Sequence, residues 1–521
     1  MPGTAERDGS IRMSIQRLFA AWLCLAPTAL LTCSKPQSST PPRSEDEWYT
    51  VEMQGQRCGH MHSTQQQVGD EMHTRTAMTV EIVRGPAKIK ITMDQRYRET
   101  MDGKPLGFES EMLMGQMPVK QKGTVADVKI TLVTDQMGAS HTNTYDFDPE
   151  CKFAWGLLLE QRARGIKPGM KFTVKTYEPS VRADGPVEVT FNVEDKEKVD
   201  VRGTKRELYR VTSTLQMQVP VQTTMWVDEE AKPIVSNMNL GFMEVRIVQS
   251  TKEEALKTDG VKGPEMFFST FVSSDKKIPA KAKSVVLKLT VPKDGDPLPD
   301  MPDTGMQSFK RVNDHEATLT IRRLDWKKLR EIAASEDGRA SAEKEMSEFL
   351  QASAMVNTGD ARIKRLAKRA VKDAKTPAEQ ADALREYVTT YVKNKGLDVG
   401  FATASEVAKT RAGDCSEHAV LLAALARAAG LPSRGVSGIV QIPWSEMPNG
   451  AESAFGYHMW TQVFIGGQWV DIDAAMRQTD CDPTHIALSL MPLNDEALGQ
   501  SVMSLLPLMG RLKIEVVKIE E

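Results

Sequence analysis

The chain has 521 residues, of which 40% are hydrophobic and 26% are charged, as in an ordinary globular protein. This length is too great for a single hydrophobic core and predicts about three compact units. The formal net charge is −3, so no basic field attracts nucleic acid, and we expect neither DNA nor RNA as a partner.

The N-terminal segment has the pattern of an export signal. Residues 18–32 carry no charge and follow two arginines. The stretch is too short to span a bilayer comfortably and suits the apolar part of a secretory signal peptide. It ends at Leu30-Leu31-Thr32-Cys33-Ser34, which resembles a bacterial lipobox apart from Thr32. We predict a signal peptide over 1–33 with lipidation at Cys33, and ordinary cleavage nearby is the alternative.

Export bears on the cysteines that follow the signal. Four remain, at Cys58, Cys151, Cys415 and Cys481, and four cysteines allow three disulfide pairings. The sequence does not choose among these pairings. A bridge between Cys58 and Cys151 would leave Cys415 as a free thiol.

The first half of the chain after the signal has a β pattern. Residues 34–46 are polar and rich in Pro and Ser, which predicts a flexible linker. Over 47–255, short alternating runs at roughly ten-residue intervals predict an antiparallel sheet or partly open barrel without a catalytic role. A second β pattern over 256–335, with strands expected at 284–291 and 317–321, predicts a small sandwich-like connector.

Helical patterns open the C-terminal part, which we assign to 336–521. Thr376-Pro377-Ala378-Glu379 has the spacing of a capping box with Pro at the first helical position. Apolar residues at helical spacing continue from Leu384 to Val392, and Gly396 is expected to end the helix. We expect this helix to pack against the unit that follows.

A cysteine begins the next predicted helix. Asp414 and Glu417 have capping-box spacing, so the helix runs from Cys415 to about Gly430. The partial positive charge of a helix N-terminus favours the reactive thiolate, but the two acidic neighbours oppose it, so a nearby imidazolium is needed. The alternative is a small buried residue in a core helix. On this helix, His418 is expected to pack or to form a hydrogen bond rather than to act as a base.

A hairpin supplies the candidate base. Gly466-Gly467 separates two alternating runs and predicts a two-residue turn in which Ile465 faces Gln468. With this register, His458 and Asp473 become diagonal neighbours on one face, about 7–8 Å apart.

Two neighbours of this pair have expected roles. Asp471 pairs with Gln462 and lies too far along the strand to orient the base. Trp460 shares the face of His458 and either shields the site or fills the core. A thiol, an imidazole and a carboxylate are thus supplied in the order of a nucleophile, a base and an orienting residue.

Several motifs in this region resemble the transglutaminase-like superfamily, which shares papain-like thiol chemistry. They are Gly413-Asp414-Cys415-Ser416-Glu417-His418-Ala419, Gly430-Leu431-Pro432-Ser433-Arg434, Gly438, His458-Met459-Trp460 and Trp469-Val470-Asp471-Ile472-Asp473. The resemblance covers about residues 360–480. It implies an α+β fold with a C-terminal cysteine-proteinase-type core preceded by antiparallel β domains. It also implies Cys415 as nucleophile, His458 as base and acid, and Asp473 as orienting residue. Family members commonly have Pro after this Asp, and this chain has Ala474.

The implied activity is acyl transfer from a carboxamide or peptide bond, by hydrolysis, deamidation or transamidation. The expected substrate is a protein or peptide of the bacterial cell envelope, where a lipid anchor at Cys33 would hold the enzyme on the membrane. The Cys415 backbone N–H is a candidate oxyanion donor. The alternative functions are a non-catalytic envelope binding or assembly protein with this fold, and an apolar-ligand carrier that uses the first β domain.

No cofactor is expected. The run Cys58-Gly59-His60-Met61-His62 offers soft metal ligands, but alternating histidines on an exposed strand are the commoner arrangement. We therefore predict no metal site.

Overall fold

The computed structural model describes residues 44–84, 87–114, 117–136, 139–178, 182, 184–216, 221–239, 243–265, 271–294, 297–333, 346–353, 355–394, 402–442, 453–493, 508 and 510–521. The predicted signal peptide, the lipidation site at Cys33 and most of the predicted linker lie outside these ranges. Within them, no helix combines the length and the apolar character needed to cross a bilayer.

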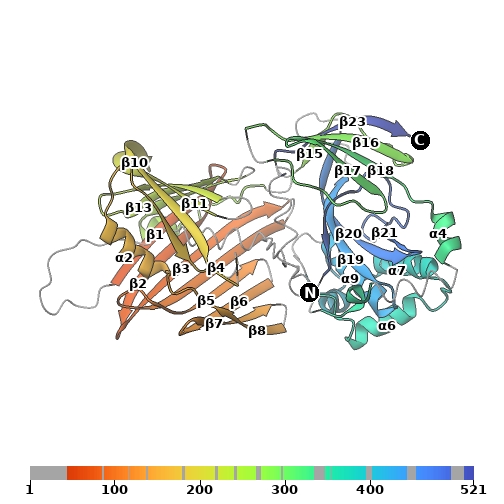
Figure 1. The fold of residues 1–521 in the computed structure, drawn as a ribbon, viewed down its shortest axis with the longest axis horizontal. Helices are drawn as coiled ribbons and strands as arrows, with labels where there is room; N and C mark the ends of the chain where they lie inside the picture. The colour runs from red at the N-terminus through yellow and green to blue at the C-terminus, as the bar shows by residue number, and fades with distance from the viewer. Residues whose placement is uncertain are drawn as a thin grey trace, which may run out of the picture.

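The chain folds mainly into two β-sheets, which occupy separate lobes in Figure 1. The first is a fully antiparallel sheet of fourteen strands, with β8 and β9 at its edges. Its strands are β1 (Ser44–Met53), β2 (Gln56–Val68), β3 (Glu71–Arg84), β4 (Ala87–Thr100), β5 (Pro105–Met114), β6 (Met117–Ala126), β7 (Lys129–Gln136), β8 (Ala139–Asp146), β9 (Lys171–Thr176), β10 (Val187–Val201), β11 (Thr204–Leu215), β12 (Val221–Val227), β13 (Pro233–Asn239) and β14 (Glu244–Ser250). The predicted antiparallel sheet is confirmed.

Two helices accompany the first sheet, namely α2 (Ala154–Arg164) and the short α3 (Lys252–Ala255). The buried Glu99 carboxylate accepts hydrogen bonds from the backbone N–H groups of Trp155 and Gly156, at 2.7 and 2.8 Å. It thereby satisfies donors that the first turn of α2 cannot pair within the helix. This contact ties α2 to strand β4.

The second sheet has nine strands. They are β15 (Val272–Ser274), β16 (Ser284–Thr290), β17 (Gln307–Asn313), β18 (Glu316–Arg322), β19 (Ser433–Gln441), β20 (Ser453–Ile465), β21 (Gln468–Ile472), β22 (Ile486–Met491) and β23 (Lys513–Glu520). The order is β17-β18-β16-β23-β15-β20-β19-β22, and β21 pairs with β20. Only the short contact between β15 and β23 is parallel among the described pairs.

The strands expected in a separate sandwich-like connector over 256–335 join this second sheet. Strand β16 pairs with β18 on one side and with β23, near the C-terminus, on the other. The prediction of an independent module is therefore corrected. Its partner strand lies more than 200 residues further along the chain, and a local alternation pattern carries no information about such a pairing.

The remaining helices gather beside β19, β20 and β21 (Figure 1). They are α4 (Trp326–Ala333), the 3₁₀ helix η2 (Ser347–Leu350), α6 (Ala361–Ala370), α7 (Pro377–Tyr391), α8 (Ala404–Thr410) and α9 (Cys415–Ala428). Helix α9 is buried from Ser416 to Arg427, because α6, α7 and α8 pack around it and the sheet lies beside it. Its mostly apolar sequence suits a helix that is enclosed on all sides.

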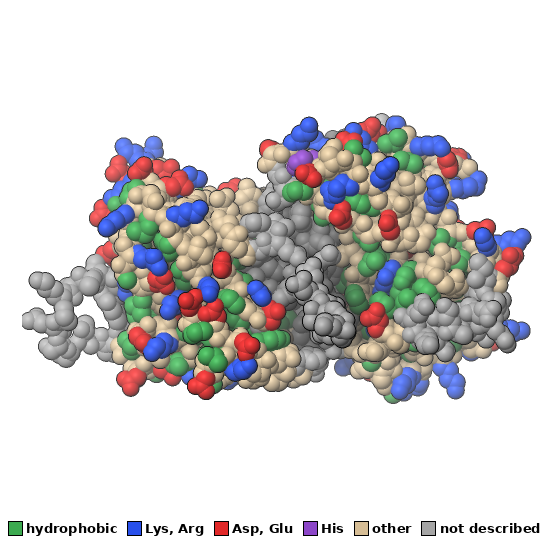
Figure 2. Space-filling model, in the orientation of Figure 1, with side chains coloured by type: hydrophobic (Ala, Val, Ile, Leu, Met, Phe, Trp, Pro, Cys, Tyr) green, Lys and Arg blue, Asp and Glu red, His purple; other side chains and the backbone are tan. Residues whose placement is uncertain are grey.

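Charged side chains of both signs are interspersed over the face of the molecule drawn in Figure 2. This distribution agrees with the small formal net charge of −3. Where basic groups lie beside acidic ones, as Arg75 and Arg96 lie beside Asp94, they form ion pairs on the surface.

Candidate active site

Cys415 is the first residue of α9, as the sequence predicted. Asp414 is the N-cap and accepts a hydrogen bond from the Ser416 backbone N–H at 2.9 Å. In return, Glu417 Oε2 accepts the Asp414 backbone N–H at 2.9 Å, which completes the predicted capping box. The half-buried thiol therefore lies at the positive end of a rigid, enclosed helix, where the field favours thiolate.

Two other segments hold the start of α9 in place. Asn394 forms a parallel bridge with Ala412, and its carbonyl accepts the Gly413 N–H at 3.0 Å. Glu417 Oε1 accepts the Ala402 N–H at 2.9 Å. Burial, together with the nearby Asp414 carboxylate, raises the pKa of Glu417 to about 8.

The hairpin that carries the base has the predicted register. Ile465 pairs with Gln468 across Gly466 and Gly467, whose φ angles of 59° and 81° suit a tight turn. The ladder ends where Thr461 faces Ile472. The residue that follows β21 is therefore free of this ladder, and its carboxylate can approach strand β20.

That next residue is Asp473, and its carboxylate contacts His458 directly. Asp473 Oδ2 lies 2.6 Å from His458 Nε2, and both side chains are buried. The Met476 backbone N–H donates to Asp473 Oδ1 at 2.8 Å, so both oxygens are engaged. The Cys415 thiol lies close enough to His458 to interact with it electrostatically. The three residues predicted to form the site are thus brought together.

Electrostatics favours charge on both members of the His458–Asp473 pair. Burial lowers the pKa of His458, but the Asp473 carboxylate and the neighbouring Cys415 side chain outweigh it and hold this pKa well above its ordinary value. Burial would raise the pKa of Asp473, but two adjacent histidines lower it well below the usual range. An imidazolium beside a carboxylate is the state that stabilises a thiolate.

Asp471 has different partners, in line with the expectation that it does not orient the base. Its Oδ1 accepts the indole N–H of Trp460 at 2.5 Å and the side-chain amide of Gln462 at 3.0 Å. Trp460 is buried, and its ring lies 6.0 Å from that of His458 in a stacked arrangement. Trp460 therefore both fills the core and covers the base.

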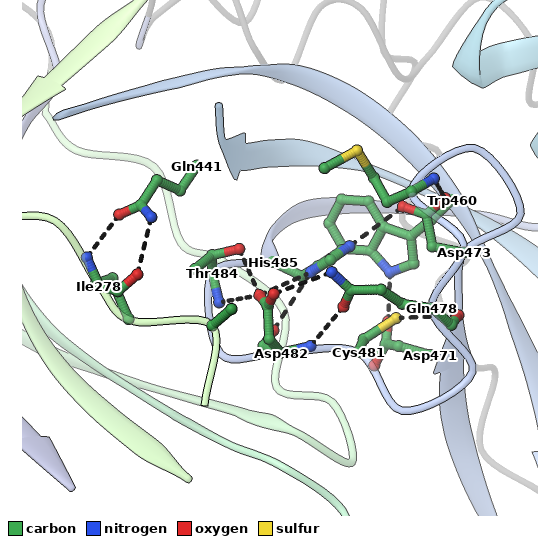
Figure 3. Close-up of polar contacts among 12 residues, drawn as sticks. Ile278, Gln441, Trp460, Asp471, Asp473, Gln478, Cys481, Asp482, Thr484 and His485 are labelled. Atoms are coloured by element: carbon green, nitrogen blue, oxygen red, sulfur yellow. Dashed lines mark hydrogen bonds and ion pairs between the residues drawn. The ribbon is translucent and has the colours of Figure 1, made fainter. Parts of the chain in front are cut away.

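Sequence reasoning missed His485, which follows the loop after β21. Its Nε2 lies 3.2 Å from Asp473 Oδ2, so one carboxylate oxygen contacts two imidazoles. Figure 3 shows His485 together with Asp473 and Asp482. The run Asp482-Pro483-Thr484 signals a turn before His485, but the contact with Asp473 depends on how the loop folds back.

His418, set aside as a base, is buried in α9 and contacts the backbone of its own helix. Its Nδ1 lies 2.6 Å from the Asp414 carbonyl oxygen. This contact matches the hydrogen-bonding role that the sequence predicted.

The cysteines Cys58, Cys151, Cys415 and Cys481 are all free thiols. A Cys58–Cys151 bridge is therefore not formed. Cys58 and Cys151 belong to different hydrophobic clusters.

Among the described residues, one group offers three metal-ligand atoms close together, namely His458, Asp473 and His485. Both imidazole nitrogens lie at hydrogen-bond distance from one carboxylate oxygen. We interpret the cluster as a hydrogen-bonded network of two histidines and one carboxylate.

The other candidate for a metal site was the run around Cys58. There, His62 contacts Asp46 at 2.8 Å and stacks on Trp48 at 4.0 Å.

One comparison with known proteins, the match to a family model, covers this part of the chain. Residues 364–474 match the model of the Transglutaminase-like superfamily, and this range includes Cys415, His458 and Asp473. A search of curated proteins found no match.

Three solved structures are similar to parts of the chain. A candidate cysteine protease from Cytophaga hutchinsonii is 15% identical with a TM-score of 0.29, over 44% of this chain and 83% of its own. A β-barrel-like protein of unknown function from Brucella abortus is 15% identical with a TM-score of 0.32, over 40% and 96%. A candidate protease from Parabacteroides distasonis is 9% identical with a TM-score of 0.19, over 73% and 69%. These scores are too low to carry an argument.

The family model is therefore the match on which the assignment rests. It covers helix α9, which begins at Cys415, and the β20–β21 hairpin that carries His458. Residues 364–474 form a transglutaminase-like domain within the longer chain.

Proposed function

We propose that the protein is a thiol enzyme that transfers acyl groups from carboxamide or peptide bonds. The observation that supports this most is the 2.6 Å contact between His458 Nε2 and Asp473 Oδ2. It leaves the other ring nitrogen of His458 for the thiol at the start of α9. A nucleophile, a base and an orienting carboxylate are what acyl transfer through a thioester requires.

The proposed reaction has two steps. The Cys415 thiolate attacks the carbonyl carbon, and the tetrahedral oxyanion collapses to a thioester when the His458 imidazolium gives its proton to the leaving amine. His458 then takes a proton from water or from an acceptor amine, which attacks the thioester and releases the thiolate. Water yields hydrolysis or deamidation, and an amine yields transamidation. The Cys415 backbone N–H at the helix start is a suitable oxyanion donor.

The test is the pH dependence of Cys415 alkylation by iodoacetamide, followed by mass spectrometry of the Cys415 peptide. The wild-type thiol should react near neutral pH at least tenfold faster than in His458→Ala, because the imidazolium stabilises the thiolate. His418→Asn is the matched control. It changes a buried histidine of α9, the helix that begins at Cys415, and should leave the rate near wild type. If wild type and His458→Ala titrate alike as ordinary thiols, the proposal fails.

A direct assay follows from the same proposal. Peptides that contain glutamine should release ammonia, and backbone cleavage would instead yield new peptide termini. Both products should disappear in Cys415→Ala. The ratio of ammonia release to amine incorporation, measured with an added primary amine, distinguishes hydrolysis from transamidation.

We also propose that the chain is exported and anchored in the bacterial cell envelope through a lipid on Cys33. The support is the uncharged run that ends at the lipobox-like residues 30–34. Expressed in a bacterial host, the mature chain should carry a lipid-modified N-terminal cysteine by mass spectrometry. Cys33→Ser should abolish this mass and release the protein from the membrane fraction.

A further inference from the structure

His485 has a hydrogen-bond acceptor at each ring nitrogen. Its Nε2 lies 3.2 Å from Asp473 Oδ2, and its Nδ1 lies 3.3 Å from the Asp482 carbonyl oxygen and 3.6 Å from Asp482 Oδ1. A neutral imidazole would turn a lone pair toward one of these acceptors, whereas an imidazolium donates to both. Burial lowers the pKa of His485, but Asp473 and Asp482 outweigh it and raise this pKa to about 9.

The loop between β21 and β22 is organised around the contacts of His485 with Asp473 and Asp482. The backbone of Gln478 pairs with that of Asp473 in both directions, at 2.7 and 2.8 Å. The Gln478 side chain donates to Asp482 Oδ2 at 2.9 Å and accepts the Asp482 N–H at 2.8 Å. The Thr484 N–H donates to Asp482 Oδ1 at 3.0 Å. These bonds form a ring that starts at Asp473 and returns to it through His485 (Figure 3).

Other charged and titratable groups face the contact between His485 and Asp473 from β20 and β21. His458 lies with its ring 6.1 Å from that of His485, and the buried Asp471 also interacts with His485 electrostatically. Trp460 meets His485 edge-on at 5.2 Å, and both side chains are buried. Asp482 also lines a cavity of about 600 Å³.

We propose that His485 is a positioning residue of the thiol site, where it is held as an imidazolium between Asp473 and Asp482. His485 holds the Asp473 carboxylate in contact with His458, and its positive charge partly neutralises the negative charge of Asp473. This inference rests on the proposed thiol chemistry. Because the charge of Asp473 is partly neutralised, the His458 imidazolium is a stronger acid. This favours proton transfer to a leaving amine near neutral pH.

Two substitutions separate the charge of His485 from its contacts. His485→Gln can keep a donor near the position of Nε2 without the positive charge. His485→Asn can keep a donor near Nδ1 and loses the contact with Asp473. The control is Tyr457→Phe on strand β20, which removes a buried hydroxyl that has no hydrogen-bond partner within the described residues.

The measurement is the rate of Cys415 alkylation between pH 5 and 10. The basic limb of this pH–rate profile reports the deprotonation of His458. In His485→Gln, it should shift to higher pH by about one unit or more, because a positive charge near His458 is lost. In His485→Asn, the rate at the plateau should also fall about tenfold. Tyr457→Phe should superimpose on wild type. A folded His485→Gln with the wild-type profile would overturn the proposal and leave His485 as a loop contact alone.

A measurement on the wild-type protein covers the case in which the variants do not fold. Nitrogen-15 spectra of labelled histidine side chains should show the His485 ring doubly protonated at pH 7.5. The signals of His458, which also contacts Asp473, are recognised by their loss in His458→Ala. A neutral His485 ring would overturn the proposal. This result is independent of the reactivity of Cys415, so failure of the proposed function is recognised separately, by alkylation that does not depend on His458.

Discussion

At the scale of single residues, two buried aspartates on one hairpin have separate tasks. Asp473 contacts His458, whereas Asp471 contacts Trp460 and Gln462. Asp473→Asn removes the charge that stabilises the His458 imidazolium. We expect the alkylation rate at pH 7 to fall by a factor on the order of 10² to 10⁴.

Asp471→Asn is the matched control for that substitution. Asp471 lies two residues before Asp473 and is also buried. Its substitution should therefore lower stability, by about 1–3 kcal/mol, and change reactivity by less than tenfold. The two variants are compared by alkylation kinetics and by urea denaturation. Equal losses of reactivity would contradict the distinct role of Asp473.

The choice of Asp473 over Asp471 was accessible from the sequence, because the two-residue turn determines the register and the register determines the distance. The contribution of His485 was not. It depends on an irregular loop in which Gln478 and Asp482 bond back toward Asp473. No periodic pattern encodes such a return. Helix capping around Cys415 was predictable because each capping bond spans only a few residues.

At the scale of elements, the two ends of α9 offer a matched pair of glycines. Gly413 has a φ of 146°, and an added Cβ would lie 2.2 Å from the Glu417 Cβ, inside the capping box. Gly430 has a φ of 87°, and an added Cβ would meet nothing within 4 Å. Gly413→Ala should therefore lower the free energy of unfolding by more than about 3 kcal/mol and slow Cys415 alkylation.

Gly430→Ala should cost about 1–2 kcal/mol through backbone strain alone and leave alkylation unchanged. Chemical denaturation and the iodoacetamide rate measure both variants. Similar losses of reactivity in the two would show that the geometry of the helix start is unimportant for the thiol.

The capping box of α9 should also make stability depend on pH. The pKa of Glu417 is raised to about 8 in the folded protein. Its contribution is therefore fully present below the unfolded pKa of about 4.3 and is lost as pH rises through about 8, by at most about 1.4 kcal/mol per pH unit. Glu417→Gln should remove this decline, measured as the free energy of unfolding from pH 5 to 8.

Glu379 is a control of opposite sign for this effect. It fills the same position in the capping box of α7, but backbone N–H groups of Lys375 and Thr376 lower its pKa. Its contribution is present above the unfolded pKa and is lost as pH falls through the lower folded value. Glu379→Gln should thus differ from wild type least in acid. Parallel curves for wild type and Glu417→Gln would contradict the assigned ionisation.

Element boundaries were less accessible than element types. Helix α7 begins at Pro377 as predicted, but it ends at Tyr391, before the expected stop at Gly396. Lys393 and Asn394 both donate backbone hydrogen bonds to the Arg411 carbonyl oxygen. A tertiary contact with the segment before Cys415 therefore ends the helix, and the local sequence does not show it.

At the scale of the whole molecule, strand β23 links the strands of the expected connector to the sheet that carries the base. It pairs with β16 on one side and contacts β15 on the other, and β15 pairs with β20. The sequence could not show this arrangement, because β16 and β23 are far apart in the chain. Damage to β23 should therefore affect both parts.

Two adjacent valines of β23 allow a controlled test. Val516 is 2% exposed, and Val517 is 57% exposed. Val516→Asp buries an unpaired carboxylate and should destabilise the second sheet by more than about 3 kcal/mol, whereas Val517→Asp should change it by less than about 1 kcal/mol. Limited proteolysis within 284–322 and alkylation of Cys415 should then respond together in Val516→Asp. Proteolysis of β16–β18 with an unchanged Cys415 profile would instead show that those strands form a separate unit, as the local pattern had predicted.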